Sequence, residues 1–277
     1  MELSINATVS LNNLAQMPLL GIGLFKIPET DIAIDSVKSA LEIGYRLIDT
    51  ATVYGNESAV GIAIKDSGIK RADIFLTTKL WNEDHGYKAA RKALEASLKR
   101  LDTHYLDLYL IHWPVPGIRL ESWRALEDMM EEGLCRSIGV SNYMKRHLVE
   151  LLMNCRIKPA VNQIELSPFN FLHREDVIQF CRKNEIHIEA YSPLTKGLKL
   201  NDPRLIRMAH RYYKTPAQLL LRWAMQEGFT VIPKSVKKER LLENARIFDF
   251  NLSPEDMSFL NSMNESLVTG WDSIDLP

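Results

Sequence analysis

Cysteine is scarce in this chain of 277 residues. The three present, Cys135, Cys155 and Cys181, show no CxxC spacing. A sparse, odd set argues against a disulfide framework and favours a reducing compartment. None has a base next to it in the sequence, so we expect structural, buried thiols.

A charge excess of one sign is also lacking. The 34 Lys and Arg residues against 35 Asp and Glu residues give a formal net charge of −1. This balance argues against a nucleic-acid or acidic-membrane partner, which needs a basic field. No run approaches the roughly 20 apolar residues of a membrane span. Residues 1–6 lack the basic and apolar regions of a signal peptide. We expect a cytoplasmic protein.

Strand-like runs alternate with helical segments from end to end. Several runs are continuously apolar, as in strands buried on both faces. The eight runs cover 20–25, 45–49, 74–80, 105–113, 137–141, 160–166, 187–192 and 230–233. The expected helices cover 31–43, 87–101, 119–132, 145–153, 173–184, 203–212, 216–227, 238–245 and a last one from Ser253. The helix at 216 starts with a capping box, Thr215 and Gln218, around Pro216.

This alternation predicts a (β/α)8 barrel formed by residues 1–277 as a single domain. The segment 3–17 precedes the first strand, and its pattern around Asn12 and Asn13 predicts a hairpin that closes the bottom of the barrel. The alternative is a doubly wound open sheet. Its glycine fingerprint is incomplete, because no third glycine follows Gly21 and Gly23 at position 26.

Four polar residues stand at or just after the ends of three consecutive strand runs: Asp49, Tyr54, Lys79 and His112. Strand ends converge on one face of a parallel barrel, where barrel enzymes place their chemistry. An ammonium at Lys79 should lower the pKa of the Tyr54 phenol, and Asp49 should keep that ammonium charged. His112 can orient a carbonyl oxygen. The set suits protonation of an oxygen while a hydride reaches the attached carbon, and it lacks a good nucleophile.

Each residue alone has an ordinary structural explanation. A single Tyr is usually a packing residue, and a single Asp–Lys pair is usually a structural ion pair. Together at neighbouring strand ends, the four residues favour a functional site.

The sequence resembles the aldo-keto reductase superfamily over about residues 20–260. Within it the chain looks most like the bacterial 2,5-diketo-gluconic acid reductase, glyoxal reductase and prostaglandin F synthase-like group. The motifs that carry the resemblance are 44–51, 80–82, 107–114, 138–142 and 231–235.

The resemblance implies a role for each of these residues. Tyr54 would be the general acid, tuned by Lys79 and Asp49, with His112 positioning the carbonyl. The cofactor would be a reduced nicotinamide dinucleotide that gives hydride from its C4. Its carboxamide would meet Ser141, Asn142 and Gln163, its ring would stack on Tyr191, and its pyrophosphate would cross Ser192 and Leu194.

Positive charge near the last strand favours NADPH over NADH. A 2′-phosphate needs Lys or Arg charge, a hydroxyl donor and a helix N-terminus. The positive charge comes from Lys234 and Arg240, and the hydroxyl comes from Ser235. Glu243 and Asn244 follow them in the sequence and are candidates for the same site. The alternative is a solvated basic helix start.

Phe25, Trp81 and Trp113 are expected to wall the substrate pocket. The C-terminal tail is short, which favours an open site for small or polar carbonyls. Trp271 could reach over that site or dock the tail elsewhere. His85 has no HExxH or HxH partner, so we predict no metal.

We expect a monomeric NADPH-dependent carbonyl reductase acting on small molecules. Three alternatives stay open. The first is a non-catalytic NADPH-binding regulatory subunit on the same fold. The second is a metal-dependent barrel hydrolase that uses His112 and Asp49. The third is a nucleic-acid binder.

Overall fold

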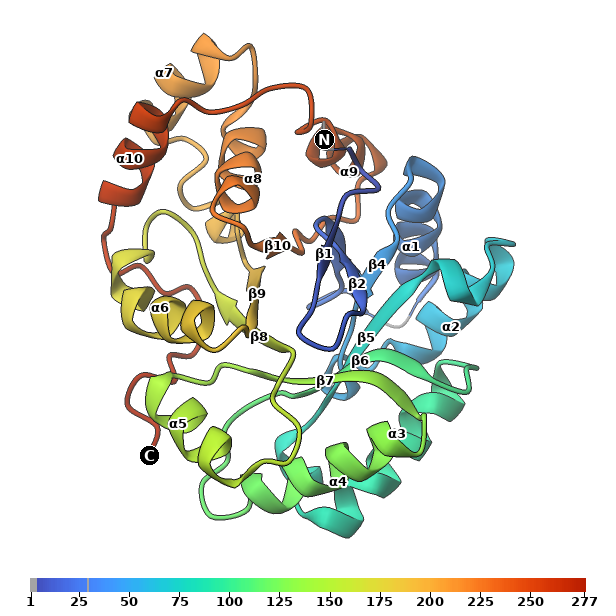
Figure 1. The fold of residues 1–277 in the computed structure, drawn as a ribbon. Helices are drawn as coiled ribbons and strands as arrows, with labels where there is room; N and C mark the ends of the chain where they lie inside the picture. Colours follow the sequence, from blue (N-terminus) through green and yellow to red (C-terminus); the bar gives the residue numbers. More distant parts are fainter. Residues whose placement is uncertain (1–3, 29) are drawn as a thin grey trace.

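Eight parallel strands form the centre of the protein. The computed structural model describes residues 4–28 and 30–277. The strands follow the order β10-β9-β8-β7-β6-β5-β4-β3, and a parallel bridge between Leu20 and Val231 joins its two ends. The sheet therefore closes into a barrel, which Figure 1 shows surrounded by helices. The predicted (β/α)8 barrel is confirmed, and the open-sheet alternative is excluded.

Each expected strand run overlaps one observed strand. The barrel strands are β3 (Gly21–Gly23), β4 (Leu47–Asp49), β5 (Phe75–Leu80), β6 (Leu106–Ile111), β7 (Cys135–Ser141), β8 (Val161–Glu165), β9 (His187–Tyr191) and β10 (Thr230–Val231). The helices are α1 (Asp31–Ile43), α2 (Glu57–Asp66), α3 (Tyr87–Arg100), α4 (Arg119–Glu131), α5 (Lys145–Asn154), α6 (Glu175–Lys183), α7 (Pro203–Arg211), α8 (Pro216–Gln226), α9 (Lys238–Ala245) and α10 (Pro254–Ser262). None of them, over the described residues, is long and apolar enough to cross a membrane.

Helix α2 is absent from the sequence-based prediction. Its central Gly61 has a low helix propensity and weakens the pattern. The structure explains the residue, because a Cβ at Gly61 would lie 2.7 Å from the carbonyl oxygen of Leu101 at the end of α3. The glycine therefore lets the two helices approach closely, a non-local requirement that outweighs local propensity.

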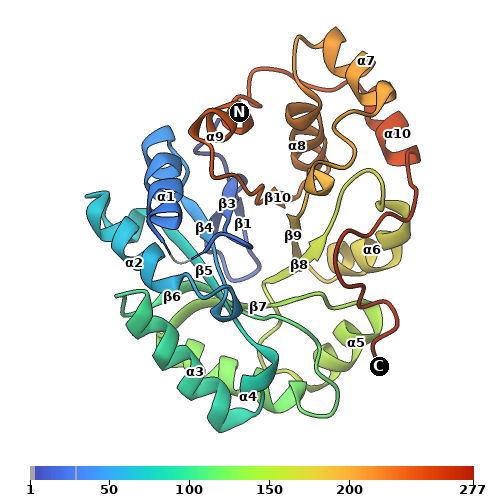
Figure 2. The same ribbon diagram turned by 180° about the vertical axis from the view of Figure 1, so that it is seen from behind.

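The expected hairpin is present. Strands β1 (Thr8–Ser10) and β2 (Gln16–Pro18) pair antiparallel. The side chain of Asn13 donates to the backbone oxygen of Arg136 at 3.0 Å, and that of Asn12 donates to the oxygen of Pro159 at 3.0 Å. These acceptors lie at or just before the starts of β7 and β8. The hairpin therefore covers the N-terminal ends of the strands; Figure 2 gives the view from behind.

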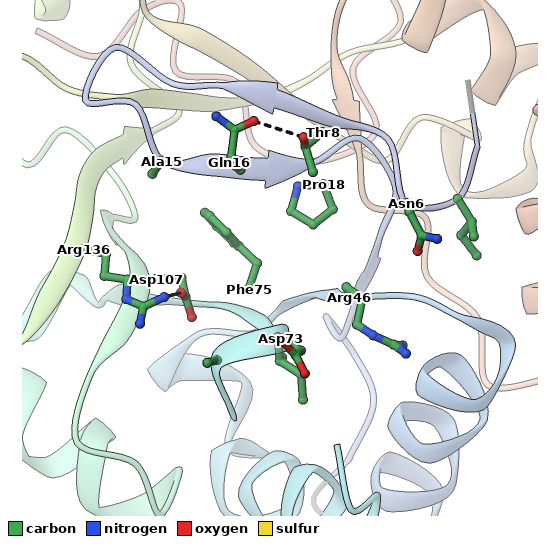
Figure 3. A pocket seen from close by; sticks show the side chains of 13 residues that line it. Asn6, Thr8, Ala15, Gln16, Pro18, Arg46, Asp73, Phe75, Asp107 and Arg136 are labelled. Carbon is green, nitrogen blue, oxygen red and sulfur yellow. Dashed lines mark hydrogen bonds and ion pairs between the residues drawn. The ribbon is translucent and has the colours of Figure 1, made fainter. Parts of the chain in front are cut away.

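This end of the barrel is closed by apolar packing. The cluster that fills it joins the hairpin to the strands through Leu11, Met17, Leu47, Phe75, Leu108, Leu110, Ala160, Val161 and Ile232. A cavity of about 410 Å³ lies between the hairpin and the starts of β4 and β5, next to Arg46 and Phe75 (Figure 3). The polar residues at the strand ends lie at the opposite end, so this cavity is not part of their site.

The cysteines mostly match the expected structural thiols. All three are free. Cys135 and Cys181 are buried, and burial raises the pKa of the Cys181 thiol to about 12. Cys155 is only half-buried, so for this residue the expectation of a buried thiol is wrong.

A buried histidine, His85, and a partly buried one, His187, predict an acid-sensitive fold. Burial lowers the pKa of His85 and of His187 from 6.5 to about 4. The unfolded chain binds protons below pH 6.5 that the folded chain does not bind, so stability present above pH 6.5 is lost as the pH falls toward 4. The thermal midpoint should fall over this range. The dependence of the thermal midpoint on pH should be shallower in His187→Gln than in the wild type. It should be unchanged in the control His104→Gln, whose side chain is exposed. Identical slopes in all three proteins would contradict a neutral His187 in the folded protein.

Candidate active site

Four polar side chains gather at the C-terminal ends of β4, β5 and β6. Asp49 is the last residue of β4, Lys79 is the penultimate residue of β5, and His112 directly follows β6. Tyr54 ends a short 3₁₀ turn, η1 (Thr52–Tyr54), where we had expected a loop. Because the three strands are neighbours in the sheet, their ends bring the four side chains to one place.

Lys79 connects the members of this group. Its Nζ donates to Asp49 Oδ1 at 2.6 Å and to the backbone oxygen of Thr50 at 2.9 Å, and it lies 3.5 Å from Tyr54 Oη. The ring centroids of Tyr54 and His112 are 5.8 Å apart, at an interplanar angle of 78°. The structure therefore brings together all four residues singled out in the sequence.

The Lys79 ammonium remains charged although it is fully buried. Burial alone would lower the pKa of Lys79, but Asp49 and Tyr54 more than offset this effect and the pKa is raised. In a buried ion pair, the remaining N–H groups of the ammonium also need hydrogen-bond acceptors to offset the free-energy cost of desolvation. The Thr50 carbonyl provides one of them.

The expected lowering of the Tyr54 pKa is wrong for this structure. Burial raises the pKa of Tyr54 by more than Lys79 lowers it. The phenol is therefore protonated at neutral pH and carries a proton to donate. Burial, followed by the charge of Lys79, holds the pKa of His112 well below 6.5. His112 is therefore a neutral imidazole, which can donate one hydrogen bond without supplying a charge.

Aromatic rings pack against two members of the polar group. Phe25 packs on Tyr54 with ring centroids 5.2 Å apart, and Trp81 packs on His112 at 5.2 Å. Trp271 from the C-terminal tail reaches Trp113, with centroids 5.8 Å apart. The tail therefore reaches Trp113, a residue expected from the sequence at the wall of the pocket.

Glu165, which we did not single out in the sequence, ties the tail to the barrel. Its carboxylate accepts hydrogen bonds from the backbone nitrogen and the hydroxyl of Thr269 at 2.7 and 2.5 Å, and from the backbone nitrogen of Gly270 at 3.2 Å. Lys196 Nζ donates to the backbone oxygen of Thr269 at 2.5 Å. In the sequence, Glu165 is visible as a carboxylate within the apolar run 160–166. Its partners could not be predicted, because they lie in a tail of irregular structure.

The residues expected to hold a carboxamide form one hydrogen-bonded group beside the four polar side chains. Ser141 Oγ donates to the backbone oxygen of Gln163 at 3.0 Å. Asn142 Nδ2 donates to the backbone oxygen of His112 at 2.9 Å, and Tyr191 Oη donates to Asn142 Oδ1 at 2.8 Å. Asn142 thereby links the Tyr191 hydroxyl to the backbone of His112.

The residues expected at the phosphates lie further along the same rim. Ser192 adopts the left-handed backbone region, with φ of 49°, and Leu194 packs against the core. Ser235 Oγ accepts from the backbone nitrogen of Lys237 at 3.1 Å, just before α9. Lys234 and Arg240 form no ion pair with any residue in 4–28 or 30–277.

Of the two remaining candidates, Glu243 turns toward the start of α8. Its Oε1 accepts from Thr215 Oγ1 at 2.6 Å. Asn244 is buried in α9.

A nicotinamide dinucleotide suits the chemistry of this donor set. The amide and hydroxyl groups at the ends of β7 and β8 are linked to the Tyr191 hydroxyl through Asn142, and such groups suit the donors and acceptors of a carboxamide. Unpaired Lys and Arg charge at a helix start suits a phosphate. Ser141, Asn142, Gln163 and Tyr191 would hold the nicotinamide end.

The four side chains do not coincide with a metal site. Among residues 4–28 and 30–277, no group of three or more His, Cys, Asp and Glu side chains is placed to hold a metal ion. His85, weighed above as a ligand, has its Nδ1 3.0 Å from the hydroxyl of Ser122.

Comparison with known proteins agrees with this geometry. The model of the Aldo/keto reductase family matches residues 20–265. Glyoxal reductase of Bacillus subtilis is 47% identical over 98% of this chain and 97% of its own length. Methylglyoxal reductase DkgA of Escherichia coli is 41% identical over 92% of this chain and 93% of its own. The aldo-keto reductase of Bombyx mori, solved in complex with NADP, superposes with a TM-score of 0.91 at 34% identity, covering 98% of this chain and 97% of that one.

The chain therefore belongs to the aldo/keto reductase family. It is an oxidoreductase, and the family resemblance read from the sequence is confirmed.

Proposed function

We propose that this protein reduces aldehydes and ketones to alcohols with NADPH, and that Tyr54 is the general acid. The observation that carries the proposal is the buried Lys79 ammonium, which lies 2.6 Å from Asp49 and 3.5 Å from the Tyr54 phenol. A bound NADPH supplies a hydride to the carbonyl carbon. Tyr54 donates its proton to the carbonyl oxygen, and neutral His112 orients that oxygen by a hydrogen bond.

The substrates we propose are small carbonyl compounds, dicarbonyls among them. The similar proteins of Bacillus subtilis and Escherichia coli are named glyoxal reductase and methylglyoxal reductase. Phe25, expected at the pocket wall, keeps 47% of its surface exposed. An open aromatic wall beside two polar donors suits a short substrate with a second oxygen.

The test follows NADPH consumption by its absorbance with methylglyoxal, nitrobenzaldehyde, simple sugars and diketones. We expect turnover with the small dicarbonyls and aldehydes. No turnover combined with tight NADPH binding would instead favour the non-catalytic regulatory subunit. The monomeric state and the cytoplasmic location remain predictions.

Arg240 is proposed to bind the 2′-phosphate that distinguishes NADPH from NADH. Arg240→Ala should weaken NADPH binding by about tenfold or more, the loss expected for a charge-assisted hydrogen bond, and should leave NADH binding nearly unchanged. Dissociation constants from tryptophan fluorescence measure both. Lys238→Ala is the matched control, because its ammonium is paired with Glu42 at 2.7 Å. Equal losses for both cofactors in Arg240→Ala would remove Arg240 from the phosphate site.

A further inference from the structure

Glu189 places an additional carboxyl group inside the barrel, next to the four polar side chains. It lies in the middle of β9 between Ile188 and Ala190, and it is fully buried. A charged residue in an apolar strand is costly to bury unless it has partners. Its position within the apolar run 187–192 is the signal of this residue in the sequence.

Glu189 shares one hydrogen-bond donor with Asp49. Gln163 Nε2 donates to Asp49 Oδ2 at 2.8 Å and to Glu189 Oε2 at 2.7 Å. An amide nitrogen has two protons, so both are used. The reversed orientation would place the Gln163 amide oxygen against the Asp49 carboxylate, which has no proton to donate. The two contacts therefore determine which way the amide faces.

Gln163 is left with one group to offer a ligand. Its Oε1 makes no hydrogen bond with any side chain or backbone group of residues 4–28 and 30–277. The backbone oxygen of Gln163 also accepts from Ser141, and Gln163 faces Glu189 across the β8–β9 pair. At this position the residue presents an acceptor, and an acceptor suits the NH₂ of a carboxamide.

We propose that Glu189 is a positioning residue for the nicotinamide, because with Asp49 it holds both amide protons of Gln163 and so turns the Gln163 oxygen toward the carboxamide NH₂ of the cofactor. This inference rests on the proposed NADPH-dependent function. Glu189 acts through Gln163 and touches neither the reacting carbonyl nor the proton donor.

The electrostatics of Glu189 are consistent with this role. Burial, followed by the charge of Asp49, raises the pKa of Glu189 to about 8. A neutral Glu189 still accepts from Gln163 and adds no second negative charge beside the Asp49–Lys79 pair. Its other oxygen, Oε1, is buried without a partner among the described residues. Glu189 therefore contributes to this site mainly through its contact with Gln163.

The test compares ligands with and without the nicotinamide. Tryptophan fluorescence titrations with NADP⁺, its 3-acetylpyridine analogue and adenosine 2′,5′-bisphosphate would be run on the wild type, Glu189→Leu, Glu189→Asp and Glu189→Gln. Glu189→Leu and Glu189→Asp should bind NADP⁺ about tenfold more weakly, because one of the two contacts that hold the Gln163 amide is lost. Adenosine 2′,5′-bisphosphate should bind as in the wild type. Glu189→Gln keeps an acceptor for Gln163 and should restore NADP⁺ binding.

The acetylpyridine analogue isolates the proposed contact. Its acetyl group has no NH₂, so the substitutions at Glu189 should change its affinity far less than that of NADP⁺. Glu57→Gln is the matched control. Glu57 is also a buried carboxyl group and accepts from Thr78 at 2.6 Å, outside the cofactor group. It should leave all three dissociation constants unchanged, whatever its melting temperature.

The results that would contradict the role of Glu189 differ from those that would contradict the proposed function. Unchanged NADP⁺ binding in Glu189→Asp, or equal losses for NADP⁺ and adenosine 2′,5′-bisphosphate, would overturn the role of Glu189. Glu189→Asp retains a carboxyl group and keeps the test available if Glu189→Leu does not fold. A wild-type protein that turns over no carbonyl would instead overturn the proposed function, and the titrations would still decide the role of Glu189.

Discussion

Tyr54→Phe is expected to lower kcat for carbonyl reduction by about a hundredfold to ten-thousandfold, the usual contribution of a positioned general acid. The substitution removes one oxygen and keeps the ring that packs on Phe25 at 5.2 Å. The proton donor is lost, whereas the residues proposed to hold the cofactor stay in place. NADPH binding, measured by tryptophan fluorescence, should remain within about twofold of the wild type, since few groups near the cofactor change.

The control for this experiment is Tyr109→Phe. Tyr109 lies in β6 and is fully buried, and its hydroxyl has no partner among the described residues. The same chemical change at this position should leave kcat unaltered. Turnover that survives in Tyr54→Phe would reject Tyr54 as the acid. A loss of NADPH binding in the same variant would show that the phenol also holds the cofactor.

Lys79→Met is expected to have the largest effect on stability. It removes the cation from a pair whose side chains are 0% and 3% exposed and leaves the Asp49 carboxylate buried without its partner. Breaking a buried pair in this way costs about 3–5 kcal/mol of unfolding free energy. Reduction should also fall, because Lys79 no longer lies beside the Tyr54 phenol. Urea unfolding and initial rates measure the two effects separately.

A double variant tests whether the unpaired charge of Asp49 causes the loss of stability in Lys79→Met. In Lys79→Met/Asp49→Asn neither charge remains, so the double variant should be more stable than Lys79→Met while its activity stays low. The exposed pair Lys65–Asp102, at 75% and 68% exposure, provides the control. Lys65→Met should change stability by less than about 1 kcal/mol. A double variant no more stable than Lys79→Met would contradict an unpaired Asp49 as the cause.

Much of the site was visible in the sequence because its residues follow strands. Each of Asp49, Lys79 and His112 lies at or beside the end of a buried strand, and parallel strands in a barrel place such ends together. Phe25, Trp81 and Trp113 were predicted for the pocket by the same reasoning. Local patterns were sufficient here, because the fold turns a position along a strand into a position in space.

Contacts between distant segments were not visible in this way. The hydrogen bond from Gln163 to Asp49 joins residues 114 positions apart, and no periodicity indicates it. The same holds for Glu165 and the tail. The direction of the Tyr54 pKa shift also depended on the complete environment, because desolvation by distant segments outweighed the charge of Lys79.

The sequence by itself determined the alternation of strands and helices, and with it the barrel and the convergence of Asp49, Tyr54, Lys79 and His112. These follow from periodicity and order along the chain, which are local properties. Only the tertiary structure decided that Gly61 lies inside a helix, that Trp271 reaches Trp113, and that Glu189 and Asp49 share the amide of Gln163. These features depend on distances between segments, which are set when the barrel closes and its core packs.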